Sequence, residues 1–208
     1  TFDVLMTRLP FEKLHERLDH AFSHHPESPT LNDFRAGKKL IELENKALTK
    51  ARQIITPHTE IAEIFKNKVV TLDWFIPPSS NGQASGHKVL FPASAIGRKG
   101  AYEIRRLASE LQLNLTVSGT TTENDNFWNE LHIENFNGNF DQIRLVVYPT
   151  YIEHQPRQIL NAISKGIPII TTAACGLKDS DQVKIIELSN YEHLKIEVSK
   201  RMGIHHEC

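Results

Sequence analysis

Residues 149–171 have the sequence PTYIEHQPRQILNAISKGIPIIT, and this stretch decides the fold class. A short apolar strand ends just before it, at Tyr148. Pro156 suits the first turn of a helix, where its missing N–H group costs nothing, and Gly166 is a typical helix stop. Residues 167–170 are apolar on both faces, as in a parallel strand covered by helices. The residues between Pro156 and Gly166 have helical spacing, with the apolar positions Ile159, Leu160 and Ile163.

The loop of this strand-helix-strand unit carries a carboxylate, Glu153, shortly after the first strand. Open α/β sheets bind ligands outside the carboxyl ends of their strands, so a ligand is expected at this loop. An anionic or sugar-like ligand suits it, because the backbone N–H groups of His154 and Gln155 can hold phosphate or sugar oxygens just before the helix. The simpler alternative is that Glu153 only caps the helix.

Strands and helices alternate from residue 88 onward, which predicts an α/β fold with a doubly wound parallel sheet. Besides the helix of the quoted stretch, we expect helices at 99–111, near 123–130 and from Tyr191 onward. The expected strands are 88–92, 113–118, 131–136, 144–148, 167–171 and 184–188.

The first 85 residues predict a smaller α/β region. Its elements are a strand at 3–7, a helix within 33–52, a strand at 54–55, a helix opened by Thr56 and Pro57, and a strand at 68–74. Residues 77–86, PPSSNGQASG, are rich in turn and linker residues. We therefore expect a partial N-terminal domain with its linker at 1–85, a Rossmann-like domain at 86–190 and a C-terminal helix at 191–208.

Composition excludes several classes of protein. The chain has 208 residues, 39% of them hydrophobic, with a net charge of −1. This content supports a real core, and the near-neutral charge argues against a general nucleic-acid binder. There is no apolar run of about 18 residues to predict a membrane span, and no signal-peptide pattern. We expect a cytoplasmic protein and leave peripheral membrane association open.

Metal and nucleophile patterns are also missing from the sequence. Cys175 and Cys208 make no disulfide framework, and Cys175 is expected to be a small buried side chain. The histidine pairs at 24–25 and 205–206 lack a third ligand at a suitable spacing, so no metal is expected. The absence of a Ser-His-Asp order, a Walker loop and a Gly-x-Gly-x-x-Gly fingerprint argues against hydrolases, kinases and dinucleotide-dependent dehydrogenases.

A second informative loop, residues 91–102, has the sequence FPASAIGRKGAY and follows the first strand of the predicted sheet. A helix start offers unpaired N–H groups and a positive dipole end, and the two glycines allow a ligand to approach the backbone. Arg98 and Lys99 would add charge-assisted hydrogen bonds of about 1.5–3 kcal/mol each. We interpret this loop as a phosphate site, with a solvated turn as the alternative.

The quoted stretch resembles the signature of the GT-B glycosyltransferases, in particular glycosyltransferase family 4. In that family a Pro-Ser-x-x-Glu loop leads into a Glu-Ala-x-Ala-x-Gly-x-Pro-Val-Ile helix and strand. Glu153 matches the first glutamate of the family's Glu-x7-Glu pair, whereas Asn161 stands where the second belongs.

The second loop is similar to the same family in its Lys99-Gly100 pair, whose lysine helps to hold the diphosphate of a nucleotide sugar in the family. The family's earlier Gly-Arg is replaced here by Ala93-Ser94. Arg98, next to the lysine, is a candidate to compensate.

The resemblance implies retaining transfer of a hexose from a nucleoside-diphosphate sugar to an acceptor hydroxyl, as in polysaccharide biosynthesis. Glu153 would face the donor sugar, and Lys99 with Arg98 would neutralise the leaving diphosphate. Asn161 would reach the ribose with one acceptor oxygen where the glutamate has two. Gly119, after the second strand, would lie beside the nucleotide, with a plain strand-end turn as the alternative.

The resemblance further implies no cofactor apart from the donor substrate, and a saccharide or lipid-linked acceptor held mostly by the first domain. The initial Thr1 and the short length indicate an incomplete enzyme, and a homo-oligomer stays open. A non-catalytic GT-B-like module for nucleotide sugars or for a partner protein is the competing hypothesis. A response-regulator-type domain is a third, although no acidic pair follows the first strand.

Overall fold

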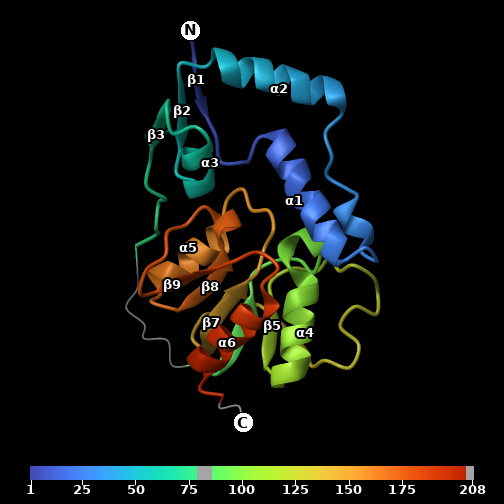
Figure 1. The fold of residues 1–208 in the computed structure, drawn as a ribbon. Coiled ribbons are helices and arrows are strands. Elements are labelled where there is room, and N and C mark those ends of the chain that lie inside the picture. Colours follow the sequence, from blue (N-terminus) through green and yellow to red (C-terminus); the bar gives the residue numbers. More distant parts are fainter. Residues whose placement is uncertain (79–85, 205–208) are drawn as a thin grey trace.

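Two parallel β-sheets form the framework of the computed structural model, which describes residues 1–78 and 86–204 (Figure 1). Within these residues the first sheet has three strands in the order β1-β2-β3. The second has six, in the order β6-β5-β4-β7-β8-β9. All the paired strands run parallel.

The six-stranded sheet is doubly wound. The chain runs outward from β4 through β5 to β6, returns to the other side of β4, and runs outward again from β7 through β8 to β9. The order therefore reverses between β4 and β7, which is where such sheets bind ligands. This topology confirms the predicted fold class. The strands are β4 (Lys88–Phe91), β5 (Leu115–Val117), β6 (Ile133–Asn135), β7 (Ile143–Tyr148), β8 (Ile169–Thr172) and β9 (Val183–Ile186).

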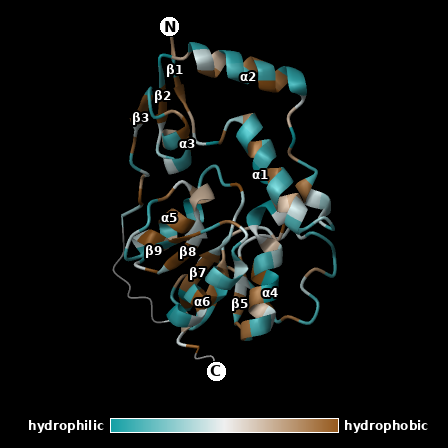
Figure 2. Cartoon of the chain, viewed as in Figure 1, coloured by the Kyte–Doolittle hydropathy of each residue, from teal (hydrophilic) through white to brown (hydrophobic). Residues whose placement is uncertain are grey.

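Helices cover both faces of this sheet. α4 (Ala101–Leu111) follows β4, α5 (Arg157–Ser164) follows β7, and α6 (Tyr191–Met202) follows β9. Right-handed crossovers that run in opposite directions place α4 and α5 on opposite faces. α6 packs beside α4 and against β7 and β8. Figure 2 shows apolar strands between helices whose outer sides are hydrophilic. The core therefore lies between the sheet and the helices on each of its two faces.

The three-stranded sheet belongs to the first unit, residues 1–78, which also contains four helical segments; the six-stranded sheet belongs to the second unit, residues 86–204. Its buried core includes Leu14, Leu18 and Ile54, and the loop after β7 adds Tyr151 and Ile152 to the same core. That loop is therefore packed between the two units. The elements are β1 (Asp3–Leu5), α1 (Phe11–His24), the 3-10 turn η1 (Pro29–Leu31), α2 (Lys38–Lys50), β2 (Gln53–Thr56), α3 (Thr59–Ile64) and β3 (Val69–Thr71).

Residues 123–130 do not form a helix, so that prediction was wrong. The side-chain oxygen of Asn124 accepts the Asn126 N–H at 3.0 Å, and the Thr122 hydroxyl donates to the Asn124 carbonyl at 2.9 Å. Such local bonds satisfy backbone groups that a helix would otherwise use. Phe127 is buried and anchors these turns.

Two further differences lie in the first unit. Helix α1 was not predicted, because its buried positions Leu14, Leu18 and Ala21 stand among histidines and charged residues. The helix expected at Thr56 begins instead at Thr59, because Thr56 ends β2 and its hydroxyl accepts the N–H of His58, the N-cap residue.

Residues 79–85, most of the predicted linker, lie outside the described residues, as do 205–208 with their histidine pair. No helix in the rest of the chain is long and apolar enough to cross a membrane.

Gly100 should be far less replaceable than Gly138. Both have a left-handed backbone, with φ of +81° and +91°. A Cβ atom at Gly100 would overlap the Pro149 carbonyl, whereas Gly138 has open space around it. We expect Gly138→Ala to lose about 1–2 kcal/mol of unfolding free energy from its backbone alone. Gly100→Ala should lose at least about 3 kcal/mol because a clash is added. Urea denaturation measures both losses, and equal values would contradict the close approach at Gly100.

Candidate functional site

Two loops leave the adjacent strands β4 and β7 at the point where the sheet order reverses (Figure 1). Both emerge from the carboxyl edge of the sheet because the two strands are parallel. A cavity of about 340 Å³ opens between them. The end of β7, both loops and the start of α5 line it, through Pro92, Tyr148, Glu153, Gln155, Pro156, Arg157, Gln158 and Ile159.

A part-buried ion pair joins these loops. Lys99 Nζ lies 2.9 Å from Glu153 Oε2, and only 19% and 14% of the two side chains are exposed. The ammonium also donates to the Ile152 carbonyl at 3.0 Å. The Tyr148 hydroxyl donates to Glu153 Oε2 at 2.5 Å. The structure thus brings together Lys99 and Glu153, which the sequence analysis assigned to the phosphate and sugar sides of one site.

The second carboxylate oxygen, Glu153 Oε1, accepts the backbone N–H groups of His154 at 2.7 Å and Gln155 at 2.9 Å. These are the N–H groups predicted to hold ligand oxygens, and here they hold the carboxylate. Helix α5 has Pro156 at its N-cap without a side-chain capping bond. Glu153 therefore organises its own loop and does not cap the helix.

Electrostatics fix the protonation of the site. Burial raises the pKa of Glu153, but the Lys99 charge and the hydrogen bonds from Tyr148 and Lys99 outweigh it and hold this pKa at about 2. Burial, with the Glu153 charge, raises the pKa of Tyr148 well above its usual range. Burial, with the Lys99 charge, lowers the pKa of His154 to about 4. At neutral pH the site holds an ionised carboxylate, a neutral phenol and a neutral imidazole.

Arg98 lies beside Lys99 but takes a different set of contacts. Its guanidinium carbon is 4.9 Å from the ring centroid of Phe34, and burial lowers its pKa. Its carbonyl accepts the N–H groups of Tyr151 at 3.0 Å and Ile152 at 3.2 Å, which ties the first loop to the second. Phe34, from the first unit, also lies 5.5 Å from the His154 ring between centroids. Nothing in the sequence pattern pointed to Phe34.

Gly100 and Gly119 mark close approaches between loops. Gly100 packs against Pro149, and a Cβ atom at Gly119 would overlap the backbone of Ser94. Loop packing by itself accounts for both glycines. Their contact with a nucleotide stays a prediction.

Asn161 lies on α5, eight positions after Glu153, and is half-buried. Its carbonyl accepts the Ser164 hydroxyl at 2.8 Å. Asn161 is not part of the cavity lining described above. Its contact with a ribose also stays a prediction.

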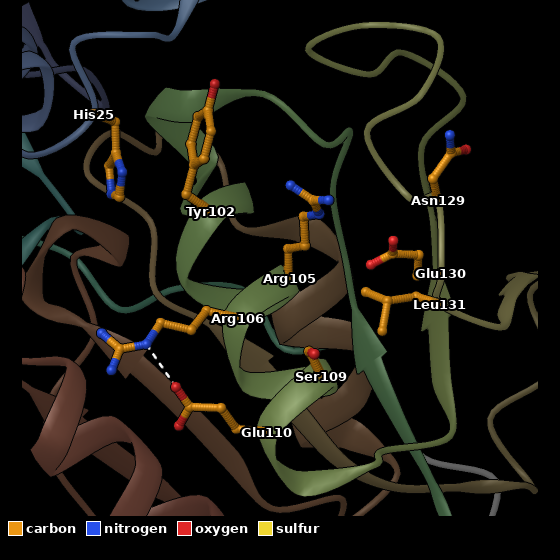
Figure 3. A pocket seen from close by; sticks show the side chains of 9 residues that line it. All are labelled: His25, Tyr102, Arg105, Arg106, Ser109, Glu110, Asn129, Glu130 and Leu131. Carbon is orange, nitrogen blue, oxygen red and sulfur yellow. Dashed lines mark hydrogen bonds and ion pairs between the residues drawn. The ribbon is translucent and has the colours of Figure 1, made fainter.

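A larger cavity, of about 450 Å³, lies on the outer side of α4 opposite residues 129–131 (Figure 3). No predicted site residue lines it. Its Arg106 Nε donates to Glu110 at 2.7 Å, and Glu110 also accepts Lys195 at 2.7 Å, so these charges are already paired. We assign the site to the smaller cavity, because it opens where the strand order reverses and Glu153 lines it. Lys99, the ion-pair partner of Glu153, is not part of this lining.

Within residues 1–78 and 86–204, no group of three or more His, Cys, Asp or Glu side chains is arranged to hold a metal ion. Tyr148 is the main site residue that sequence analysis missed. Its signal was available, because a polar hydroxyl follows the apolar residues 145–147 directly before the Glu153 loop.

Comparison with known proteins finds structural neighbours. No protein-family model matches the chain, and no curated protein matches its sequence. TarM from S. aureus aligns with a TM-score of 0.62 at 14% identity, over 82% of this chain and 40% of TarM. The pneumococcal O-GlcNAc transferase GtfA, in complex with UDP and GlcNAc, gives 0.56 at 13%, over 79% and 40%. The lipopolysaccharide outer core galactosyltransferase WaaB gives 0.58 at 10%, over 77% and 55%.

These neighbours are GT-B glycosyltransferases. The chain has the GT-B fold. This confirms the fold expected from the resemblance, although the chain spans only 40–55% of the three proteins named. Within the GT-B fold of this chain, the Lys99–Glu153 pair lies at the carboxyl edge of the six-stranded sheet, beside the first unit.

The Glu153 charge should stabilise the fold in a pH-dependent way. Its pKa falls from 4.5 to about 2 on folding. The carboxylate therefore stabilises the protein above pH 4.5, and this contribution is lost as the pH falls toward 2. Such a shift corresponds to on the order of 3 kcal/mol. We expect Glu153→Gln to lose about that much unfolding free energy at neutral pH and about half near pH 3.

Urea denaturation at the two pH values measures these losses. The control is Glu134→Gln, because Glu134 pairs with Lys88 at 2.6 Å but is 44% exposed. Glu134→Gln should lose much less unfolding free energy than Glu153→Gln, because an exposed ion pair contributes little. Equal losses of unfolding free energy from the two variants would count against a special role for the Lys99–Glu153 pair.

Proposed function

We propose that this chain is the donor-binding part of a GT-B glycosyltransferase, which transfers a hexose from a nucleoside-diphosphate sugar to an acceptor hydroxyl. The observation that carries this proposal is the part-buried Lys99–Glu153 pair at the reversal point of the sheet. The UDP and GlcNAc in the GtfA structure support a nucleotide sugar as the ligand class. The acceptor would be a saccharide or a lipid-linked saccharide.

Lys99 would stabilise the leaving diphosphate. Its ammonium has three N–H groups, two of which have acceptors within the described part of the chain, Ile152 and Glu153. The third can donate to a phosphate oxygen, and Arg98 adds a second positive charge next in the chain. When the bond between the anomeric carbon and the phosphate oxygen breaks, the diphosphate keeps the electron pair, and these cations stabilise it.

Glu153 would act on the sugar. A carboxylate with a pKa of about 2 is ionised at neutral pH, so it is no general acid there. It suits the positive charge that develops at the anomeric carbon, or a sugar hydroxyl. The acceptor oxygen then bonds to this carbon and its proton passes to the leaving diphosphate. Retention of configuration is expected from the resembled family.

A non-catalytic nucleotide-sugar module is the second candidate, and Asn161 favours it. An amide offers one acceptor oxygen to a ribose where a glutamate offers two charged ones. Donor binding without turnover would fit this candidate.

Nucleotide sugars should bind at Lys99. We expect a UDP-, GDP- or ADP-sugar to raise the midpoint of thermal unfolding by mass action. Lys99→Gln should weaken this binding by about 10- to 100-fold, the effect of losing a hydrogen bond of about 1.5–3 kcal/mol. Lys88→Gln is the matched control, since Lys88 is similarly buried, with 14% exposed, and pairs with Glu134.

No thermal shift with any nucleotide at millimolar concentration would contradict both candidates. Transfer that disappears in Glu153→Ala and Lys99→Ala would favour the enzyme. Binding without transfer in the full-length protein would favour the module.

Asn161→Glu should strengthen nucleotide binding by about tenfold, because a charged acceptor replaces an amide toward the ribose hydroxyls. Isothermal titration with UDP measures the gain. The same titration with a 2′,3′-dideoxy nucleotide should show none. An equal change with both ligands would mean that position 161 does not face the ribose.

A further inference from the structure

Glu123 is a buried carboxylate, 6% exposed, in the turn segment after β5. Its hydrogen-bond partners come from other parts of the chain. One oxygen accepts the Gly97 N–H and the Thr30 hydroxyl. The other accepts the Ser28 hydroxyl at 2.7 Å and the Tyr102 hydroxyl at 3.2 Å. This one side chain therefore joins the first unit, the loop after β4 and helix α4.

The hydrogen bond from the Gly97 N–H connects Glu123 to the candidate site. Gly97 begins the 3-10 turn η2 (Gly97–Lys99), and Lys99 ends it. The Gly100 N–H donates to the Gly97 carbonyl at 2.9 Å, which closes the turn. A carboxylate that fixes Gly97 thus fixes the start of the turn from which the Lys99 ammonium extends.

The same turn is held from two further directions. On the Glu123 side, the Ala95 N–H donates to the Thr121 carbonyl at 2.9 Å. On the first-unit side, Gly97 packs so closely on Ser28 and Leu31 that an added Cβ would collide with their side chains. Glu123 accepts hydrogen bonds from both Gly97 in the turn and Ser28 in the first unit, so it connects the turn to the first unit.

Tyr102 keeps its role as a donor to Glu123 at neutral pH. Burial and the Glu123 charge raise the pKa of Tyr102 to about 12. Its ring stacks on His25 from the first unit, with centroids 4.6 Å apart and planes 11° apart (Figure 3). The group around Glu123 is therefore held by packing as well as by hydrogen bonds.

We propose that Glu123 is a positioning residue of the nucleotide-sugar site: by holding Gly97 against Ser28 and Thr30, it sets the place of Lys99. This inference rests on the proposed function for its ligand. By this inference, residues 28–30 of the first unit support the phosphate side of the candidate site, although they lie about 70 positions before Lys99 in the sequence.

Glu103→Gln is the matched control for Glu123→Gln. Glu103 is also buried, with 7% exposed, and also joins α4 to the first unit, accepting His25 Nε2 at 2.8 Å. It also accepts the Tyr151 hydroxyl, but it makes no bond to Gly97. Both variants replace a buried carboxylate by an amide, so general destabilisation affects both.

Amide hydrogen exchange and UDP titration separate the two roles. We expect Glu123→Gln to speed exchange at residues 96–100 by at least about tenfold and to weaken UDP binding by a similar factor. Glu103→Gln should leave both close to wild type. If Glu123→Gln does not fold, the milder pair Ser28→Ala with Thr30→Ala removes two of the same bonds and should give the same pattern.

Unchanged exchange at 96–100 in a folded Glu123 variant, or an equal increase in Glu103→Gln, would overturn the inference. If wild-type protein binds no nucleotide, the proposed function fails. The exchange data then decide separately whether Glu123 positions the turn.

Discussion

The part-buried Lys99–Glu153 ion pair is the interaction on which the candidate site depends. Taking two charges out of water is expensive, and apolar residues of similar size would often stabilise a fold as well. Here the cost is offset by four hydrogen bonds to the carboxylate, from Lys99, Tyr148 and the N–H groups of His154 and Gln155. A pair held in this form suits a ligand site, because the third N–H group of the lysine can donate to a phosphate oxygen while the other two keep Ile152 and Glu153.

The site also depends on how the two units meet. Tyr151 and Ile152, directly before Glu153, are buried in the core of the first unit. A second contact lies at the loop after β8, where His58 Nε2 is 3.2 Å from the Ala174 carbonyl and Trp74 donates to the Gly176 carbonyl at 3.0 Å. A shift of one unit against the other would therefore move the Glu153 loop. The geometry of the site thus depends on the relative position of the two units.

Sequence periodicity predicted β7, α5 and β8 well, because their apolar residues recur at the spacing of a buried strand or of a helix. It failed at 123–130, where the Asn124 side chain competes for the backbone, a choice that periodicity does not report. The two loops were predicted from their residue types and their resemblance to a family. Their direct contact was not, since Lys99 and Glu153 are 54 positions apart. The four partners of Glu123 lie between 21 and 95 positions away in the sequence, and only the folded chain shows them together.

The most direct test of the assignment is a crystal structure of this chain with UDP bound. We predict the diphosphate outside the carboxyl ends of β4 and β7, within hydrogen-bond distance of Lys99 Nζ and beside Arg98. The ribose should lie toward α5. UDP bound in the larger cavity on α4, or no bound nucleotide at a saturating concentration, would contradict the assignment of this edge of the sheet as the donor site.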